Sequence, residues 1–311
     1  MKKIFTLALL SVAFFNLNSF AQDGGKIDRA ALAEKSAKAY KGMDNVDVDV
    51  HYKTYKGMEL ALDIIHPKKQ LYKDGSPVII QLHGGGWGGG NRYIIDANEM
   101  KRYSDLGIAL VQITYCKQTI EECVVDCFDA TRFLALNAKK YNLDMSRVAI
   151  SGHSAGAHLC LMLTLAPDEV FPGDEALKGA KYKILCGSAK APISTLIDDE
   201  IFAKYPRSKG RASKTANWGG VPFNESFEQR KRLSPIIYIT KDSPKVQIIH
   251  GDVDEACTIE ETRKTCEYAK KIGNEIEFHE VKGMGHGVRK ARNDEEEAFY
   301  SKYLLKDIER L

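Results

Sequence analysis

Two short glycine-rich segments of this sequence carry a serine and a histidine that could perform acyl transfer. Ser154 is the centre of GHSAG at residues 152–156, which follows the apolar residues 148–150 and precedes a helix-like stretch at 158–165. A Gly-x-Ser-x-Gly pattern between a strand and a helix predicts a nucleophile elbow, a sharp turn whose glycines avoid Cβ clashes. The turn would present the serine hydroxyl at a helix N-terminus, with the Ala155 N–H facing a developing oxyanion.

A base and an acid for this serine are available further along the chain. His286 lies in GMGHG at residues 283–287. A serine hydroxyl is a poor nucleophile at neutral pH, so a histidine must accept its proton and return it to the leaving alcohol. The histidine in turn needs a carboxylate on its other nitrogen, to fix the tautomer and offset the imidazolium charge. Asp252 and Asp254 lie in one turn after residues 245–249, and residue type alone does not separate them.

The segment HGGGWGGG at residues 83–90 follows another apolar run, at 77–82. Packing does not explain so many glycines, because glycine loses the most conformational entropy on folding and buries no side chain. A loop of this kind lets backbone N–H groups approach a ligand closely. We expect Gly85 and Gly86 to supply further oxyanion-hole donors and Trp87 to wall the acyl side. A flexible linker is the alternative, whereas a phosphate-binding loop is disfavoured because the lysine and Ser/Thr of a P-loop are missing.

The remaining histidines of these segments are expected to support the structure. We expect His153 and His158, which flank the serine, to pack against the sheet or shape the turn. We expect His83 to brace the glycine loop by hydrogen bonding and His250 to order the turn that carries the acid.

Strands and helices that could position these segments are visible in the apolar pattern. Two early segments alternate apolar and polar residues, while later ones are continuously apolar, as parallel strands buried on both faces are. Strands are predicted at residues 46–52, 58–65, 77–82, 108–115, 147–151, 184–187, 245–249 and 275–281. Helices are predicted at residues 98–106, 120–140, 158–165, 258–272 and 294–311.

The order of these features resembles the α/β-hydrolase superfamily: a serine after the fifth strand, an acid after the seventh and a histidine after the eighth. The motifs HGGGW at 83–87 and GHSAG at 152–156 look like its esterase branch, nearest to the carbohydrate-esterase-like group of acetyl-xylan and feruloyl esterases. The resemblance implies a mostly parallel eight-stranded sheet flanked by helices. It also implies a triad of Ser154, His286 and Asp254, because it places the acid at the end of HGDVD. Asp252 stays the alternative acid.

Composition and the N-terminus set the broad class. The 311 residues are 44% apolar and 28% charged, which suits a large folded α/β domain. Residues 1–21 have the basic, apolar and small-residue regions of a cleaved signal peptide, which predicts a secreted or periplasmic protein without a membrane span. Losing Lys2 and Lys3 lowers the net charge from +3 to +1, which gives no reason to expect nucleic acid as a partner. Residues 22–45 are interpreted as a short surface helix or a mobile leader, and 46–311 as the hydrolase domain.

The seven cysteines are an odd number, so at least one is unpaired. Export makes disulfides possible, and the candidate pairs are Cys116 with Cys123 or Cys127, and Cys257 with Cys266. The favoured interpretation is that most are small core residues. The absence of Cys-x-x-Cys and of histidines at ligand spacing argues against a metal site, and no cofactor is predicted.

Residues 193–234 break the alternation of strands and helices and are interpreted as a small insert or lid over the site. Its basic residues include Lys204, Arg207, Lys209, Arg211 and Lys214.

The function expected from all of these features is an exported serine carboxylesterase that removes short acyl groups, foremost acetyl, from carbohydrate esters, with a small-molecule or polysaccharide ester as its substrate. A general short-chain carboxylesterase and an amide or peptide hydrolase are the alternatives on the same fold. A non-catalytic binding protein is disfavoured because such proteins usually lose the serine or histidine. The sequence does not predict an oligomeric state.

Overall fold

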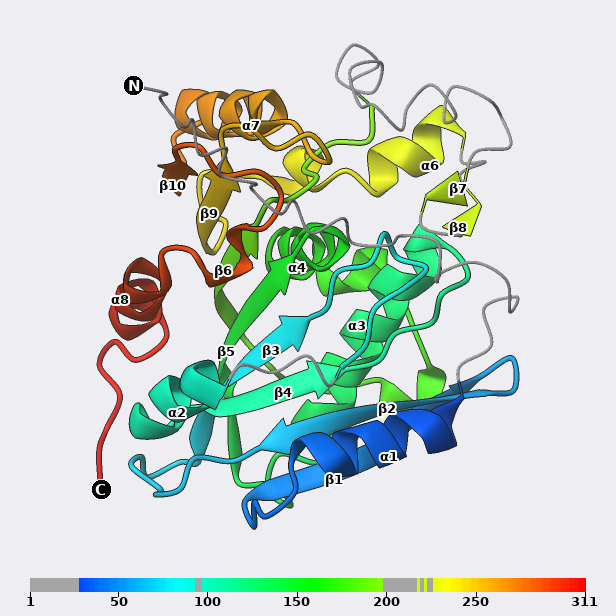
Figure 1. Ribbon diagram of the computed structural model, residues 1–311, viewed down its shortest axis with the longest axis vertical. Helices are drawn as coiled ribbons and strands as arrows, with labels where there is room; N and C mark the ends of the chain where they lie inside the picture. The colour runs from blue at the N-terminus through cyan, green and yellow to red at the C-terminus, as the bar shows by residue number, and fades with distance from the viewer. Residues whose placement is uncertain (1–27, 93–96, 198–216, 219–220, 223–225) are drawn as a thin grey trace, which may run out of the picture.

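The computed structural model describes residues 28–92, 97–197, 217–218, 221–222 and 226–311. Its main feature is an eight-stranded sheet with the strand order β1-β2-β4-β3-β5-β6-β9-β10 (Figure 1). The strands are β1 (Val46–Tyr55), β2 (Met58–Ile65), β3 (Ser76–Leu82), β4 (Ala109–Ile113), β5 (Leu143–His153), β6 (Ile184–Lys190), β9 (Lys245–Gly251) and β10 (Ile276–Val281). All eight strands predicted from the sequence are therefore confirmed, with shifted ends.

The strand directions bring four loops to one edge of the sheet. β2 pairs antiparallel with both β1 and β4, whereas all later neighbours pair in parallel. The predicted mostly parallel sheet is thus confirmed. Because parallel strands share one direction, the carboxyl ends of β3, β5, β9 and β10 meet at the same edge. Those ends carry the glycine loop, Ser154, the acid turn and His286.

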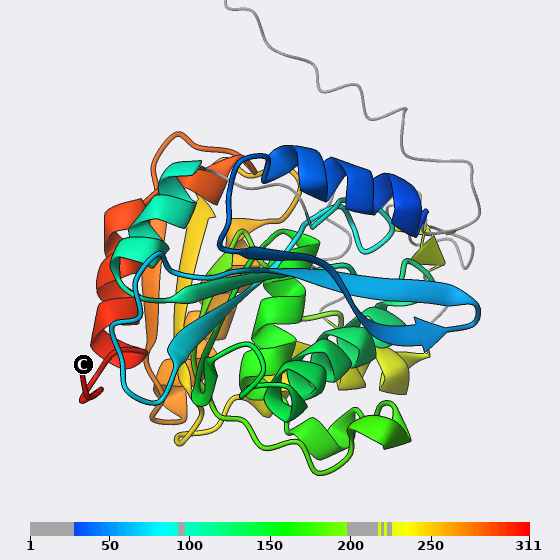
Figure 2. The same cartoon turned by 90° about the horizontal axis from the view of Figure 1, so that it is seen from below.

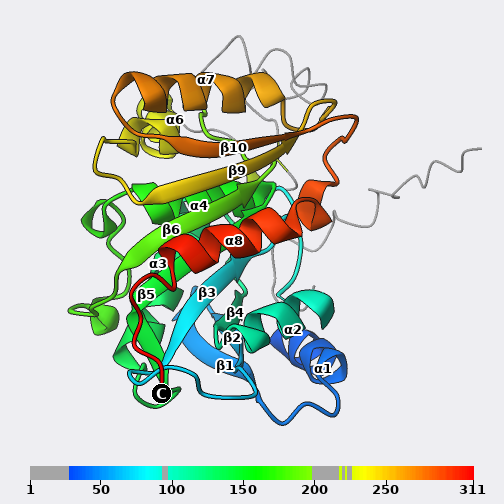
Figure 3. The same cartoon turned by 90° about the vertical axis from the view of Figure 1, so that its left-hand side faces the viewer.

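Helices cover both faces of the sheet, with α3 and α4 on one face and α2 and α8 on the other (Figure 3). The helices are α1 (Arg29–Ala39), α2 (Ala97–Asp105), α3 (Ile120–Leu136), α4 (Ala155–Leu165), α6 (Phe227–Arg232), α7 (Ile259–Lys271) and α8 (Asn293–Tyr303). A separate two-stranded ribbon joins β7 (Asn217–Trp218) to β8 (Val221–Pro222).

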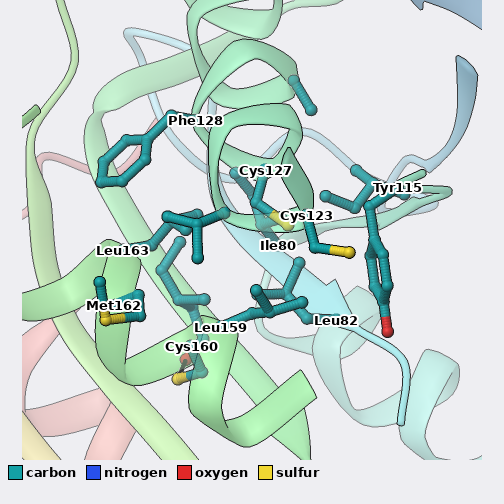
Figure 4. Close-up of a cluster of buried hydrophobic side chains, with 14 of the residues drawn as sticks. Ile80, Leu82, Tyr115, Cys123, Cys127, Phe128, Leu159, Cys160, Met162 and Leu163 are labelled. Carbon is teal, nitrogen blue, oxygen red and sulfur yellow. Dashed lines mark hydrogen bonds between the residues drawn. The ribbon is translucent and has the colours of Figure 1, made fainter. Parts of the chain in front are cut away.

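Two hydrophobic cores explain why the central strands are apolar without interruption. Successive side chains of a strand point to opposite faces, so Ile80 packs in one core and Ile79 in the other. The larger core lies under α3 and α4, and Figure 4 shows part of it. There Leu159 and Leu163 of α4 belong to the same cluster as Ile80 of β3. The smaller core contains residues of α2 and α8.

Two predicted helices end earlier than expected. α3 ends at Leu136 instead of residue 140. Directly after this end, the side-chain amide of Asn137 donates to the Phe133 carbonyl. α8 ends at Tyr303 instead of residue 311. Beyond it the chain pairs with a distant segment, since the Leu311 N–H donates to the Leu71 carbonyl. That long-range pairing leaves no trace in the local apolar period.

The segment expected to be a short surface helix or a mobile leader contains the helix α1, which packs on the domain. Leu32 and Ser36 are buried against β1 and β2. The ribbon of α1, in blue, lies over β1 and β2 (Figure 2). The Ser36 hydroxyl donates to Asp63 Oδ2 at 2.7 Å, and Tyr40 is buried in the smaller core. The folded domain therefore begins before residue 46, because α1 covers apolar surface that the sheet would otherwise expose.

All seven cysteines lie in the described ranges, none of them forms a disulfide, and six of them are buried. The favoured interpretation of small core residues therefore matches the structure, and the candidate disulfide pairs are not formed. The predicted signal peptide at 1–21 and the basic residues of the insert, from 204 to 214, lie outside the described residues. Within the described ranges, no helix has both the length and the apolar character needed to cross a bilayer.

Candidate active site

Ser154 lies in a tight turn between β5 and α4 and has φ 59° and ψ −124°, a conformation rare for a residue with a side chain. The neighbouring glycines are required by close backbone contacts. A Cβ on Gly152 would lie 2.1 Å from the Gly156 carbonyl oxygen, and one on Gly156 would lie 2.1 Å from the Leu82 carbonyl oxygen. Both distances are far inside van der Waals contact, so the two glycines let the turn pack against β3. The predicted nucleophile elbow is the observed geometry.

His286 joins this serine to a carboxylate. Its Nε2 lies 2.9 Å from Ser154 Oγ, and its Nδ1 lies 2.8 Å from Asp254 Oδ2. A carboxylate can only accept, so Nδ1 carries the proton and Nε2 is the free base that accepts the serine hydroxyl. The three side chains come from loops after β5, β9 and β10, more than 100 residues apart in sequence at the widest. Their arrangement suits proton transfer from serine to histidine.

Asp254 is held as a carboxylate by four hydrogen-bond contacts. Its Oδ1 accepts the backbone N–H groups of Ala256 and Cys257 at 2.8 and 2.9 Å. Its Oδ2 faces His286 Nδ1 and lies 3.3 Å from His250 Nε2. Burial opposes ionisation, but the contacts with His250 and His286 outweigh it and hold the pKa of Asp254 well below its usual range. The group facing the histidine is therefore ionised at neutral pH.

The alternative acid, Asp252, points elsewhere. Its Oδ1 accepts the backbone N–H of Gly283 at 2.6 Å, and its Oδ2 lies 3.8 Å from Lys282 Nζ. Asp252 therefore ties the acid turn to the turn after β10. His250 has the ordering role expected for it, since its Nδ1 also lies 2.8 Å from Thr262 Oγ1. Of the two aspartates, Asp254 faces the histidine.

The glycine loop lies directly beside the serine. A Cβ on Gly84 would be 3.3 Å from Ser154 Cβ, and one on Gly85, at φ +124°, would be 2.5 Å from the Gly89 backbone. Among the described residues, the N–H groups of Gly85 and Gly86 find no acceptor. Ala155 is the first residue of α4, where the N–H lacks an intrahelical partner. The three expected oxyanion-hole donors thus come from the loop and the helix end that border Ser154.

Trp87 does not form the acyl wall that the sequence suggested. Its side chain is fully buried, its backbone has φ 61°, and its indole N–H donates to His158 Nδ1 at 3.2 Å. The left-handed backbone turns the ring inward, where the hydrogen bond and the apolar contacts of the core hold it. Trp87 therefore fixes the glycine loop to α4, and the assignment of a substrate contact was wrong for this conformation.

Three histidines near the site are held neutral. Burial lowers the pKa of His83, His153 and His158 to about 4. His83 Nδ1 lies 2.9 Å from the Gly84 carbonyl, and its ring stacks on Tyr115. His153 Nε2 donates to the His286 carbonyl at 2.7 Å, and His158 Nε2 donates to the Leu233 carbonyl at 2.8 Å. Each histidine thus braces a loop of the site, as expected for residues that serve structure.

These neutral histidines predict a loss of stability in mild acid. In the unfolded chain a histidine has its ordinary pKa of about 6.5, so the unfolded state binds more protons than the folded state between about pH 6.5 and 4. The free energy of unfolding should therefore fall as the pH falls through this window, by about 1.4 kcal/mol per pH unit for each of the fully buried His83 and His158. Urea unfolding at pH 7, 6 and 5 measures it. A free energy that stays level would contradict the neutral assignment.

Sequence reasoning did not find Arg92, which anchors the far end of the glycine loop. The guanidinium is only 1% exposed, and it donates to Asp63, Asp49 and Thr114 at 3.1, 2.7 and 2.9 Å. Asp63 is also the acceptor for Ser36 of α1, so the loop and the first helix share one buried carboxylate. An arginine just after a glycine run was the only local signal, and its partners lie far away in the sequence.

In the described part of the chain, no group of three or more histidine, cysteine or acidic side chains is arranged to hold a metal ion.

The strand order, with serine, acid and histidine after β5, β9 and β10, defines a protein of the α/β-hydrolase fold. The sequence model of one family, BD-FAE, matches residues 62–267, more than half of the chain. This chain belongs to the BD-FAE family.

Relatives and solved structures agree with that class. Esterase LipQ of Mycobacterium tuberculosis is 27% identical over 213 residues, which are 64% of this chain and 47% of LipQ. The chain spans about half the length of the curated relatives it matches. The Est2 esterase of Thermogutta terrifontis with butyrate bound superposes with a TM-score of 0.67 and 22% identity, covering 84% of this chain and 93% of Est2. A truncated carbohydrate esterase from gut microbiota superposes with a TM-score of 0.68 and 21% identity, covering 84% of this chain and 98% of that esterase. At these identities the structural likeness establishes the fold.

Proposed function

We propose that this protein is a serine carboxylesterase that removes short acyl groups, foremost acetyl, from carbohydrate esters. The observation that carries the proposal is the line of Ser154 Oγ, the His286 ring and Asp254, with separations of 2.9 and 2.8 Å beside backbone N–H groups of the glycine loop. A hydroxyl, a neutral imidazole and a buried carboxylate in this order form the machinery of acyl transfer through a covalent intermediate.

The order of proton transfers follows from the tautomer of His286, with the proton on Nδ1 and Nε2 free to accept. Ser154 Oγ attacks the ester carbonyl carbon while His286 Nε2 takes the hydroxyl proton, and Asp254 stabilises the resulting imidazolium. The oxyanion is held by the N–H groups of Gly85, Gly86 and Ala155. When the intermediate collapses, the carbon–oxygen bond to the alcohol breaks, and His286 returns the proton to the leaving oxygen. Water then attacks the acyl-enzyme by the same proton transfers and releases the acid.

A carbohydrate ester as the substrate is supported by the resemblance of the two glycine motifs to carbohydrate esterases and by the fold shared with the gut microbial carbohydrate esterase. The proposed signal peptide at 1–21 also favours an extracellular polymer over a cytoplasmic metabolite. If export occurs with cleavage after Ala21, N-terminal sequencing of the exported protein will begin at Gln22. A short-chain carboxylesterase remains the second candidate, because Est2, which shares the fold, binds butyrate.

Acetate release separates these two substrates. If a sugar polymer is the substrate, kcat/KM for acetylated xylan should exceed that for p-nitrophenyl acetate by about tenfold or more, because contacts with the sugar lower the barrier to reaction. Both rates are measured on one preparation, with the Ser154→Ala protein as the blank. A preference for the simple ester, rising from acetate to butyrate, would contradict the carbohydrate proposal and leave ester hydrolysis intact.

A further inference from the structure

Lys190, the last residue of β6, contacts both catalytic loops. Its backbone carbonyl accepts the N–H of Ser154 at 2.9 Å, and it pairs with His153 in the register of β5 and β6. Its ammonium donates to the Arg289 carbonyl at 2.9 Å. Arg289 lies three residues after His286, in the short 3-10 turn η6 (Val288–Lys290). One residue thus holds the serine turn by its main chain and the histidine loop by its side chain.

The ammonium is fixed in place by a buried ion pair. Lys190 is 5% exposed, and its Nζ lies 2.8 Å from Oε2 of Glu296, a fully buried residue of α8. The hydroxyls of Tyr103 and Tyr300 each reach Glu296 at 3.4 Å, as does that of Ser151, three residues before the nucleophile. Held by these partners, the Glu296 carboxylate has little rotational freedom, and it fixes the Lys190 ammonium in turn. A buried ion pair of this kind is costly unless it has a compensating role.

The packing around η6 suggests how the histidine loop depends on this bond. Val288 is buried against Ala191 and Ile249, so the loop rests on the ends of β6 and β9. Apolar contact is not directional, so by itself it does little to fix the position of the loop along the sheet edge. The bond from Lys190 to the Arg289 carbonyl is directional. It acts together with the bond from His153 to the His286 carbonyl to fix the loop's position along the sheet edge.

We propose that Lys190 is a positioning residue that sets the separation of His286 from Ser154, with Glu296 as the anchor of its ammonium. The inference rests on the proposed function, since it concerns how the same site is held. Lys190 takes no part in proton transfer, because its charged atom contacts only Glu296 and a backbone carbonyl among the described residues. It acts by keeping Nε2 of His286 within hydrogen-bond reach of the serine hydroxyl.

The test compares Lys190→Met with Lys190→Arg and with a matched control. Lys53→Met serves as the control because Lys53 is equally buried and paired with two carboxylates, Asp126 and Asp129, both at 2.7 Å. That ion pair joins β1 to α3 instead of the catalytic loops. Each variant is measured at a temperature where circular dichroism shows it folded. The readouts are kcat and KM for p-nitrophenyl acetate, and the rate at which a fluorophosphonate labels Ser154.

For Lys190→Met we expect kcat and the labelling rate to fall together by about 10- to 100-fold, since small misplacements of catalytic groups have costs of this size. KM should change by less than about threefold, because the substrate contacts stay intact. Lys190→Arg, which keeps the charge and the donors, should recover most of the rate, and Lys53→Met should keep wild-type kcat. In a His286→Ala background, Lys190→Met should cost nothing further.

Three results on these variants would overturn the proposal. They are a folded Lys190→Met protein with wild-type kcat, a loss of kcat in Lys53→Met equal to that in Lys190→Met, or the same fold-loss of kcat when Lys190→Met is added to His286→Ala. If Lys190→Met does not fold, Glu296→Gln takes its place, and an unchanged labelling rate in that variant overturns the proposal.

Hydrogen exchange of residues 282–292 gives a readout independent of turnover. Exchange should rise in Lys190→Met and not in Lys53→Met, even if wild-type protein hydrolyses no ester. A wild-type protein that hydrolyses no ester would contradict the proposed function alone. Unchanged hydrogen exchange in Lys190→Met would contradict the role of Lys190.

Discussion

The Ser154→Ala protein should fold normally and hydrolyse p-nitrophenyl acetate at least about 10⁵-fold more slowly than wild type, because the attacking oxygen is gone. The residual rate would come from the oxyanion donors acting on bound water. Alanine keeps the Cβ in the strained turn, so the free energy of unfolding should change little. The measurement is kcat by initial rates, with urea unfolding to check the fold.

Ser146→Ala provides the control for this experiment. Ser146 is exposed and bonds only Asp144 among the described residues, so its removal should leave kcat unchanged. Mass spectrometry after fluorophosphonate treatment should find the label on Ser154 in both wild type and this control. Substantial ester hydrolysis by Ser154→Ala, or a label on another serine, would contradict the proposed nucleophile.

We expect Asp254→Asn to lower kcat far more than Asp252→Asn does, although the two residues lie in one turn. An amide at 254 cannot offset the imidazolium charge, and it favours the tautomer with the proton on Nε2, where it blocks attack. We expect kcat to fall about 10⁴-fold, equivalent to about 5.5 kcal/mol in the barrier. An amide at 252 can still accept the Gly283 N–H through its oxygen, so kcat should stay within about threefold of wild type.

The pH profile gives this comparison a second readout. Because the contacts with His250 and His286 hold the pKa of Asp254 well below its usual range, Asp254 remains ionised across the working pH. The Asp252→Asn protein should therefore keep the wild-type profile of kcat/KM, whereas in Asp254→Asn the acidic limb should move to lower pH, because the protonated base loses the carboxylate that stabilises its charge. A greater loss of kcat at 252 than at 254 would reverse the assignment of the acid and with it our interpretation of the turn after β9.

Some features of the site were predictable because short segments encode them. A Cβ at residue 152 would clash with the backbone of Gly156, only four residues further on, so the glycine pattern of this segment shows the clash directly. The eight strands were predictable for a related reason. Burial on one or both faces imposes an apolar period that depends on the strand itself.

Other features depended on partners that no local pattern reveals. Trp87 stands in a loop beside the nucleophile, and only the structure shows that a left-handed backbone directs its ring to His158 in the core. Asp252 and Asp254 are equivalent in type, and the choice between them rests on where the turn after β10 places His286.

By itself, the sequence predicted the fold class, the proposed nucleophile and the proposed base. The strands follow from apolar periods that each segment carries alone, and the resemblance of the motifs and their order to the α/β-hydrolases supplied the rest. The tertiary structure decided which aspartate faces the histidine, that Trp87 is buried, and that α1, Arg92 and Lys190 support the catalytic loops. Each of these depends on side chains brought together from separate elements, and the geometry of such a contact is set by the packing of the whole sheet.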